Sequence, residues 1–222
     1  MHDGGAATAA GHAAGAARLG YEPADAARLR DVLRADASRR RARGGRSRAE
    51  RDRRVRRARV TLVLNRIDDR LIHGQVVVGW GQPLDVRFIV LVDDAVAASD
   101  WEKELYRMGV PPEMEVRFHS AAEAAPLLDV YRTESHPGIL LTGDIATMRE
   151  LVLHGGVREV NVGGIHHRAG RRQYLRYVFL TADEQRALRE VAALGALVTA
   201  QDVPAARAVP LEEMLASGEV AS

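Results

Sequence analysis

Residues 60–75, "VTLVLNRIDDRLIHGQ", join an apolar run to a stretch that is crowded with charge. Residues 60–64 are almost continuously apolar and rich in β-branched side chains, which is typical of a strand covered on both faces. Residues 66–75 then bring two arginines, two aspartates and one histidine, with a glycine directly after the histidine. The pattern predicts a buried strand of a parallel sheet, with a polar site at its carboxyl end.

Short apolar runs alternate with amphipathic segments through about 160 residues from this point. The predicted strands are residues 60–64, 86–92, 114–118, 138–142, 159–162, 174–180 and 196–200. The predicted helices are residues 74–80, 95–108, 121–131, 145–154, 182–194 and 211–216. Thr181 and Glu184 form a capping-box pair at the start of one helix, and Gly195 follows its end. This alternation predicts one α/β domain over residues 60–222, an open, mostly parallel twisted sheet with helices on both faces.

The net charge of +2 over 222 residues conceals a strong asymmetry. Residues 1–59 contain 16 arginines and seven acidic residues, a charge of +9, and the remaining residues carry −7. This Ala- and Arg-rich segment has few large apolar residues, so we expect a disordered basic extension or an over-long reading of the gene. A tether to nucleic acid or to an anionic membrane is the functional alternative for it.

Composition excludes several classes of protein. The chain has no cysteine, which rules out disulfides, thiolate metal sites and cysteine nucleophiles. It has no apolar run of 18 residues and no secretory signal, so we expect no membrane insertion and a cytoplasmic location. No G-x-G-x-x-G follows the first strand, which argues against dinucleotide binding.

The charged stretch can support phosphoryl chemistry. In parallel sheets the ligand crevice lies beyond the carboxyl ends of the strands, which is where His73 is expected, with Gly74 opening the next helix. Backbone N–H groups at a helix start favour an anion, and Arg70 offers a planar fork of donors to phosphate oxygens. Asp68 is expected to accept a hydrogen bond from the imidazole and so fix its tautomer. A histidine that receives and passes on a phosphoryl group fits this set, and an ion-paired surface histidine is the alternative.

The segment 66–76, "RIDDRLIHGQV", resembles the phosphorylation-site signature of the IIB subunits of the mannose/fructose/sorbose-type bacterial phosphotransferase system. The resemblance covers residues 60–215, and further matching segments follow in the same order and spacing. These are "IVLVDDAVAASD" (89–100), "MGVPP" (108–112), "LLTGDIATMRELVLHGGVREVNVGGIHHRAG" (140–170) and "LTADEQRALREVAALG" (180–195).

The resemblance implies a function and a set of site residues. A phosphorylated IIA partner would phosphorylate His73, which would then donate the group to a sugar held by membrane IIC and IID subunits. Arg70 would bind the phosphoryl oxygens, and Asp68 would orient the ring. The implied phosphate or partner loop consists of Asp69, Gly74, Gln75, Asp93, Asp94, Gly163 and Gly164. No metal and no organic cofactor are implied, and a homodimer is one option, since members of that family are often dimeric.

Two other functions compete with sugar uptake. The first is a regulatory histidine phosphoprotein that uses the same loop as a signalling or binding module without a transported sugar. The second is a nucleic-acid-binding protein that uses the arginine run, although the acidic body and the scarcity of aromatic residues in the extension argue against it. The sequence does not name the sugar.

The remaining histidines and one tryptophan have ordinary structural interpretations. His119, His136 and His154 are expected in core or surface roles, and Trp80 in a core or interface role, with stacking on a sugar as the alternative for Trp80. The adjacent His166 and His167 point to opposite faces of an extended segment, so they do not bind one metal together. They belong to "IHHRAGRR" (165–172), for which we expect a solvated basic loop at the rim, with attraction of a phosphorylated partner by Arg168, Arg171 and Arg172 as the alternative.

Overall fold

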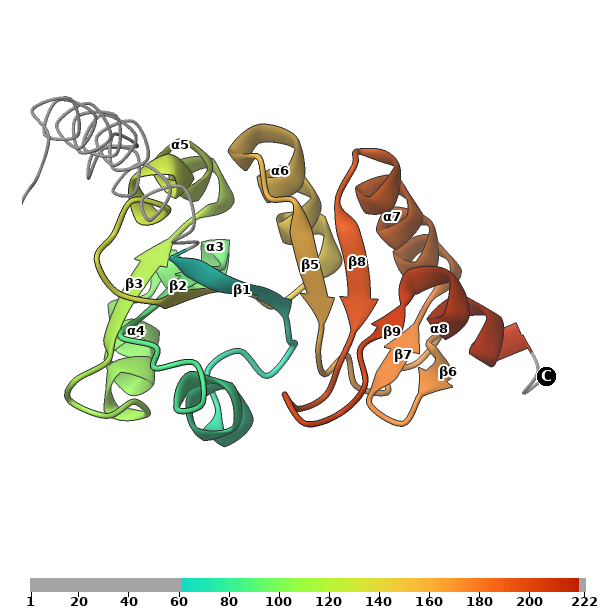
Figure 1. Cartoon of the computed structure of the whole chain (residues 1–222), viewed down its shortest axis with the longest axis horizontal. Coiled ribbons are helices and arrows are strands. Elements are labelled where there is room, and N and C mark those ends of the chain that lie inside the picture. The colour runs from blue at the N-terminus through green and yellow to red at the C-terminus, as the bar shows by residue number, and fades with distance from the viewer. Residues whose placement is uncertain (1–60, 220–222) are drawn as a thin grey trace, which may run out of the picture. The chain divides into compact units, whose positions relative to one another are not determined.

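A computed structural model describes residues 61–219 of the chain (Figure 1). The prediction made for residues 1–59 lies outside the described part. The strands are β1 (Leu62–Ile67), β2 (Phe88–Val92), β3 (Glu115–His119), β4 (Gly138–Thr142), β5 (Glu159–Val162), β6 (Arg172–Leu175), β7 (Val178–Leu180), β8 (Leu197–Ala200) and β9 (Val209–Pro210). The helices are η2 (Gln75–Gly81), α3 (Asp94–Ala98), α4 (Asp100–Met108), α5 (Ala121–Tyr131), α6 (Ile145–Gly155), α7 (Ala182–Ala193) and α8 (Leu211–Glu219).

Seven strands form one sheet in the order β3-β2-β4-β1-β5-β8-β9, and Figure 1 labels these strands except β4. All neighbours pair in parallel except β8 and the edge strand β9, which are antiparallel. The prediction of an open, mostly parallel sheet is confirmed. β1 lies between β4 and β5, so its carboxyl end is in the middle of the sheet edge.

Side chains that alternate along the strands fill two separate cores. On β2, Phe88 and Val90 face the core that α5, α6, α7 and α8 cover. Ile89 and Leu91 face the opposite core, to which η2 and α3 contribute. Because both faces of the inner strands are buried, β2 and β4 read as continuous apolar runs, and helices lie on both faces as predicted.

Two predicted elements are divided in the structure, and one strand of the structure was not predicted. Residues 174–180, predicted as one strand, form part of an antiparallel hairpin, β6–β7, which turns at Arg176 and Tyr177 and is a separate two-stranded sheet. The predicted helix 95–108 is interrupted at Ser99, which ends α3 and caps α4 by accepting a hydrogen bond from the Glu102 N–H. β9 was not predicted, because a two-residue strand containing Pro210 has no apolar periodicity.

The predicted capping box at the start of α7 and the predicted glycine after its end are both confirmed. Thr181 accepts a hydrogen bond from the Glu184 N–H and the Glu184 side chain accepts one from the Thr181 N–H, the reciprocal pair of a capping box. Gly195 has a φ of +92°, a left-handed conformation that glycine adopts without strain. Between residues 61 and 219 no helix combines the length and apolar character that are needed to cross a bilayer.

Candidate functional site

Residues 68–74, here called the active loop, leave the carboxyl end of β1 and lead into η2. The Asp68 N–H donates to the Thr142 carbonyl at 2.9 Å, and the Asp69 N–H donates to the Gly164 carbonyl at 2.8 Å, so the loop is held to the ends of both neighbouring strands. Leu71 has a φ of +55° and its N–H returns to the Asp68 carbonyl at 2.9 Å, which closes a tight turn. The Leu71 and Ile72 side chains are buried in the core beneath η2. The loop is therefore fixed by backbone pairing and by burial.

A fully buried ion pair lies under the active loop. Arg66, at the end of β1, donates from Nη2 and Nε to Asp68 Oδ2 at 2.9 and 3.3 Å, and neither side chain is exposed. The Gly164 N–H donates to the same oxygen at 3.1 Å, and the Arg70 N–H donates to Asp68 Oδ1 at 3.3 Å. Asp68 is thus saturated by donors, which is what a buried carboxylate requires.

The Arg66 guanidinium also donates to residues that are far away in the sequence, on β5 and after β8. Nη1 donates to Asn161 Oδ1 at 2.6 Å and to the Gln201 carbonyl at 2.9 Å, and Nη2 lies 3.4 Å from the Asp202 carbonyl. The Trp80 ring lies 5.4 Å from the guanidinium carbon. Burial lowers the pKa of Arg66 and the charge of Asp68 opposes this shift, so Arg66 stays a cation that ties β1, β5 and the segment after β8 together.

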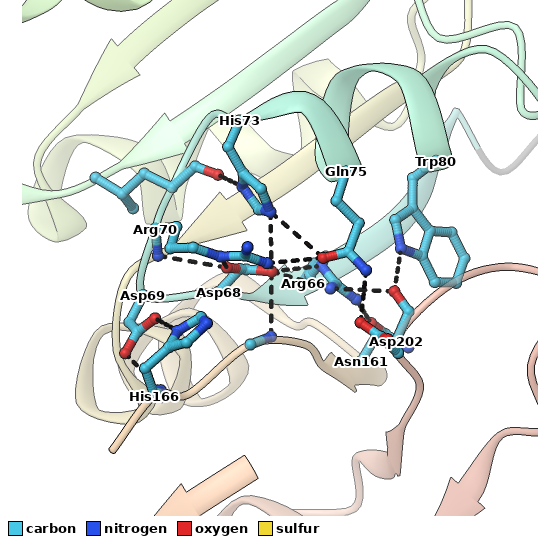
Figure 2. A network of polar contacts seen from close by, with 12 residues as sticks. Arg66, Asp68, Asp69, Arg70, His73, Gln75, Trp80, Asn161, His166 and Asp202 are labelled. Atoms are coloured by element: carbon cyan, nitrogen blue, oxygen red, sulfur yellow. Dashed lines mark hydrogen bonds and ion pairs between the residues drawn. The ribbon is translucent and has the colours of Figure 1, made fainter. Parts of the chain in front are cut away.

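His73 projects from the active loop with its ring partly exposed (Figure 2). Nδ1 lies 2.9 Å from the Leu71 carbonyl, and because a carbonyl only accepts, this contact places the ring proton on Nδ1 and leaves a lone pair on Nε2. Nε2 faces Gln75 Oε1 at 3.5 Å and Asp68 Oδ2 at 3.9 Å. The predicted hydrogen bond from the ring to Asp68 is therefore wrong: Asp68 is occupied by Arg66, and the Leu71 carbonyl takes this role.

Arg70 and Gln75 lie beside the free nitrogen of His73. Arg70 Nη2 donates to Gln75 Oε1 at 2.7 Å, and Arg70 Nε lies 3.5 Å from Asp68 Oδ1. The Arg70 side chain is 43% exposed, so part of its fork is open to a ligand. Gln75 Nε2 donates to Asp202 Oδ1 at 2.5 Å. An imidazole lone pair, an exposed guanidinium and a side-chain amide therefore meet at one edge of the sheet, a set that can receive and position a phosphoryl group.

Gly163 and Gly164 are placed against this network, as expected of residues that line the site. A Cβ on Gly163 would lie 2.2 Å from Arg66 Cζ, so only glycine leaves room for the buried guanidinium. A Cβ on Gly164 would lie 3.1 Å from Asp68 Oδ1, 3.3 Å from Arg70 Nη2 and 2.9 Å from the ring of His166. Both glycines follow β5 and let the backbone approach the active loop closely.

Asp69 links the active loop to the segment 165–172. It accepts from His166 Nδ1 at 2.6 Å and from the His166 N–H at 2.8 Å, and Arg171 Nη1 approaches at 3.4 Å. Burial alone would raise the pKa of Asp69, but the hydrogen bonds from His166 outweigh it and lower the pKa. Arg171 also pairs with Glu184 and is mostly buried, so the prediction of a solvated basic loop is wrong for this residue.

Acidification is expected to weaken this link. A carboxyl group whose pKa is lower in the folded chain contributes stability above its unfolded value, and that stability is lost as the pH falls through the folded pKa. For Asp69 the loss begins near the ordinary value of 3.8 and continues below it. Urea unfolding of Asp69→Asn should therefore show a smaller loss of stability than the wild type as the pH falls from about 4 to about 2. Asp129→Asn, at an exposed position, is the control, and equal pH slopes for Asp69→Asn and the wild type would contradict the prediction.

Asp93 and Asp94 lie at the end of β2, two strands from β1. Asp93 Oδ1 accepts from the Ala95 and Val96 N–H groups at 2.9 and 3.0 Å, so it caps α3. Asp94 Oδ1 accepts from the Ala121 N–H at 2.8 Å, at the start of α5. Both residues lie at the predicted edge of the sheet, but the hydrogen bonds of their carboxylates hold helix starts and not the active loop.

Sequence reasoning missed three side chains of the network, those of Arg66, Asn161 and Asp202. Trp80 is buried and donates from Nε1 to the Asp202 carbonyl at 3.0 Å, which confirms its core role. Among residues 61–219 no group of three or more histidine and acidic side chains is arranged to hold a metal ion.

Comparison with known proteins gives consistent matches. Residues 62–222 match a family model described as the PTS system sorbose subfamily IIB component. The chain is 34% identical over 149 residues to the N-acetylgalactosamine-specific phosphotransferase enzyme IIB component 1 of Escherichia coli (strain K12), a match that covers 64% of this chain and 91% of that protein. It is also 34% identical over 136 residues to the mannose-specific EIIAB component of the same strain, covering 60% of this chain and 41% of that longer protein.

A solved structure has the same fold. The crystal structure of the IIBSor domain of the sorbose permease from Klebsiella pneumoniae superposes with a TM-score of 0.63 at 27% identity, covering 69% of this chain and 94% of that one. The structure of the N-acetylgalactosamine-specific IIB component 1 from Escherichia coli superposes with a TM-score of 0.60 at 30% identity, covering 66% and 97%. These chains support the α/β assignment independently of the sequence motif.

Proposed function

Since this chain belongs to the sorbose subfamily of IIB components of the phosphotransferase system, we propose that His73 is the residue that carries its phosphoryl group. IIB components are phosphotransferases that take part in sugar uptake and work with IIA and IIC/IID partners. In the proposed reaction, His73 accepts the group from a phosphorylated IIA protein and passes it to a sugar at the membrane IIC and IID subunits.

The observation that supports the proposal most directly is the state of the imidazole. The Leu71 carbonyl holds the proton on Nδ1 and leaves a lone pair on Nε2. Nε2 lies 3.5 Å from Gln75 Oε1, the oxygen to which the partly exposed Arg70 guanidinium donates. The lone pair can attack an electrophilic phosphorus, and the nearby Arg70 guanidinium can offset the negative charge of the phosphoryl oxygens.

The transfer balances without any further reactant. The imidazole lone pair forms an N–P bond as the bond between phosphorus and the IIA donor atom breaks. In the second step a sugar hydroxyl forms an O–P bond as the N–P bond breaks, and the hydroxyl proton leaves to solvent or to a base on the partner. The Nδ1 proton stays on the ring throughout, donated to the Leu71 carbonyl.

The test is phosphorylation of the purified full chain by phosphoenolpyruvate through the general carrier proteins and a IIA protein of the same family. We expect one acid-labile phosphate per chain, mapped to His73 by mass spectrometry under non-acidic conditions. Stable labelling of another residue, or no labelling by any IIA protein that phosphorylates a known sorbose-subfamily IIB component, would overturn the proposal.

Arg70→Ala is expected to slow phosphoryl transfer from the IIA protein by about 10²-fold, because one charged donor to the phosphoryl oxygens is lost. Arg70→Lys should restore only part of the rate, since an ammonium group does not reproduce the planar fork. Single-turnover transfer from phosphorylated IIA measures the effect. The melting temperature should change little, because the side chain is 43% exposed. Unchanged rates would remove Arg70 from the mechanism.

A further inference from the structure

His166, which follows β5, is held against the active loop by both its ring and its backbone. Its Nδ1 donates to Asp69 Oδ1 at 2.6 Å, and its N–H donates to Asp69 Oδ2 at 2.8 Å (Figure 2). Arg171 Nη1 donates to the His166 carbonyl at 2.7 Å. Burial opposes ionisation of Asp69, but the hydrogen bonds from His166 outweigh it and lower the pKa, so the carboxylate can only accept near neutral pH. One ring proton is therefore fixed on Nδ1, and Nε2 lies on the other side of the ring.

The His166 ring lies beside Arg70 at the rim of the site. Atoms of both residues approach the point where a Cβ on Gly164 would lie, His166 Cε1 at 2.9 Å and Arg70 Nη2 at 3.3 Å. The His166 side chain is 46% exposed, and between residues 61 and 219 its Nε2 has no hydrogen-bond partner. A ring nitrogen is thus open to a ligand, next to the guanidinium that we assign to the phosphoryl oxygens.

A phosphoryl group brings more negative charge to the site than Arg70 alone balances. A protein-bound phosphoryl group carries a charge of about −1.5 to −2 at pH 7. Arg66 is fully buried in one ion pair, and Arg171 is only 10% exposed in another, so neither guanidinium is available to the phosphoryl oxygens. A protonated His166 would add a second positive charge beside Arg70.

We propose that His166 is a second phosphoryl-binding residue, whose protonated ring donates from Nε2 to an oxygen of the phosphoryl group that His73 carries. Asp69 keeps Nδ1 protonated in both charge states of the ring, so a change of pH near neutrality alters Nε2 alone. The protonated ring offers a donor and a positive charge, whereas the neutral ring offers a lone pair, which cannot donate to an anion. This inference rests on the proposed phosphorylation of His73.

The predicted signature is a pH dependence that belongs to His166. Between about pH 6 and pH 8 the charge of His166 and of His73 can change, while carboxylates and guanidiniums keep theirs. The charged groups around His166 are of those two kinds: Asp68, Asp69 and Arg70 in the active loop, Arg168 and Arg171 in the segment 165–172, and Glu184 on α7. Dividing the wild-type rate by that of a variant at position 166, at each pH, removes the titration of His73 and of the IIA protein.

His166→Asn keeps the contact to Asp69 and removes the outer nitrogen. The asparagine NH₂ group can take the place of Nδ1 as the donor to Asp69, but nothing replaces Nε2. We expect single-turnover transfer from saturating phosphorylated IIA to be about tenfold slower than in the wild type at about pH 6, the value of one hydrogen bond to a charged group. At about pH 8, where the wild-type ring is neutral, the two rates should be nearly equal. Saturation with IIA keeps differences in docking out of the rate.

His167→Asn is the matched control, because His167 is an exposed histidine next in the chain. Its ring packs edge-on against Phe179, with 5.6 Å between the ring centroids. Transfer to His167→Asn should equal transfer to the wild type at both pH values.

His166→Gln separates donation to the phosphoryl group from support of the active loop. The glutamine NH₂ group reaches about as far as Nε2 and is a neutral donor, but the donor to Asp69 Oδ1 is lost. A direct role of His166 predicts that His166→Gln transfers faster than His166→Asn at about pH 6, and a purely supporting role predicts the reverse order. Neither variant titrates at position 166, so the ratio of the wild-type rate to either variant's rate should fall as the pH rises, and one folded variant is enough for the test.

A ratio that is the same at both pH values overturns the role of His166, and so does the reverse order of the two variants. In both cases the wild type is still labelled at His73, and the proposed function stands. A wild-type chain that takes up no phosphate at His73 would instead remove the proposed function itself.

Discussion

A His73→Gln protein is expected to take up no detectable acid-labile phosphate from a phosphorylated IIA protein. The amide of glutamine has no lone pair of comparable nucleophilicity on nitrogen, so no N–P bond can form, although a similar volume and polarity remain. We expect a loss of at least about 10³-fold in the rate of labelling, the scale seen when a nucleophile is removed. The measurement is phosphate incorporation over time, with the wild type and Arg70→Ala in parallel.

The His73→Gln protein should fold as the wild type does. The ring is partly exposed, and the loop around it is held by backbone hydrogen bonds of Asp68 and Asp69 and by the buried Leu71 and Ile72. Its melting temperature is therefore expected to stay within a few degrees of the wild type. Labelling at the wild-type rate would show that another residue carries the group, and a large loss of stability would make the loss of labelling uninformative.

Arg66→Met is expected to destabilise the domain by about 3–5 kcal/mol, the usual result of leaving one partner of a buried ion pair without the other. Asp68 would keep only backbone N–H donors and the 3.5 Å contact to Arg70 Nε, in a place with no access to water. The Asn161 side chain and the Gln201 carbonyl would lose a donor as well. Urea unfolding followed by circular dichroism measures the loss.

The double variant Arg66→Met/Asp68→Asn is the informative partner of this experiment. It removes both charges, so the penalty of an unpaired buried carboxylate disappears, and the double variant should be more stable than Arg66→Met alone. If the double variant loses the sum of the unfolding free energies lost by the two single variants, Arg66 and Asp68 are not coupled. The prediction that their ion pair stabilises the domain would then be wrong. Asp129→Asn at an exposed site again controls for charge.

The sheet was predictable because its inner strands are buried on both faces. β2 and β4 are continuous apolar runs, and their ends are close to the predicted ones, with β4 matching at both ends. β1 was predicted to end near residues 64 to 66, but it continues to Ile67, because Arg66 is paired inside the protein and not in solvent. A charged residue normally signals the end of a strand. The signal that was not used is the spacing of Arg66 and Asp68, since residues two apart on an extended chain point to the same side.

The candidate site was predictable only in its local part. His73, Arg70 and Gln75 are close in sequence, and the structure brings them together beside the free ring nitrogen. Asp202 lies 127 positions after Gln75 along the chain, and no local pattern marks it, because its contact arises when the segment after β8 passes the end of β1. Leu71 was missed for another reason: it acts through its backbone carbonyl, which any residue possesses.

The reach of Arg66 to the Gln201 and Asp202 carbonyls has a consequence during synthesis on the ribosome. Domains assemble as the chain emerges, amino end first, and β1 appears long before these partners do. In a nascent chain that ends before residue 201, the Arg66 guanidinium lacks its acceptors at Gln201 and Asp202. We therefore expect the active loop to acquire its final shape only after β8 and the segment that follows it have joined the sheet.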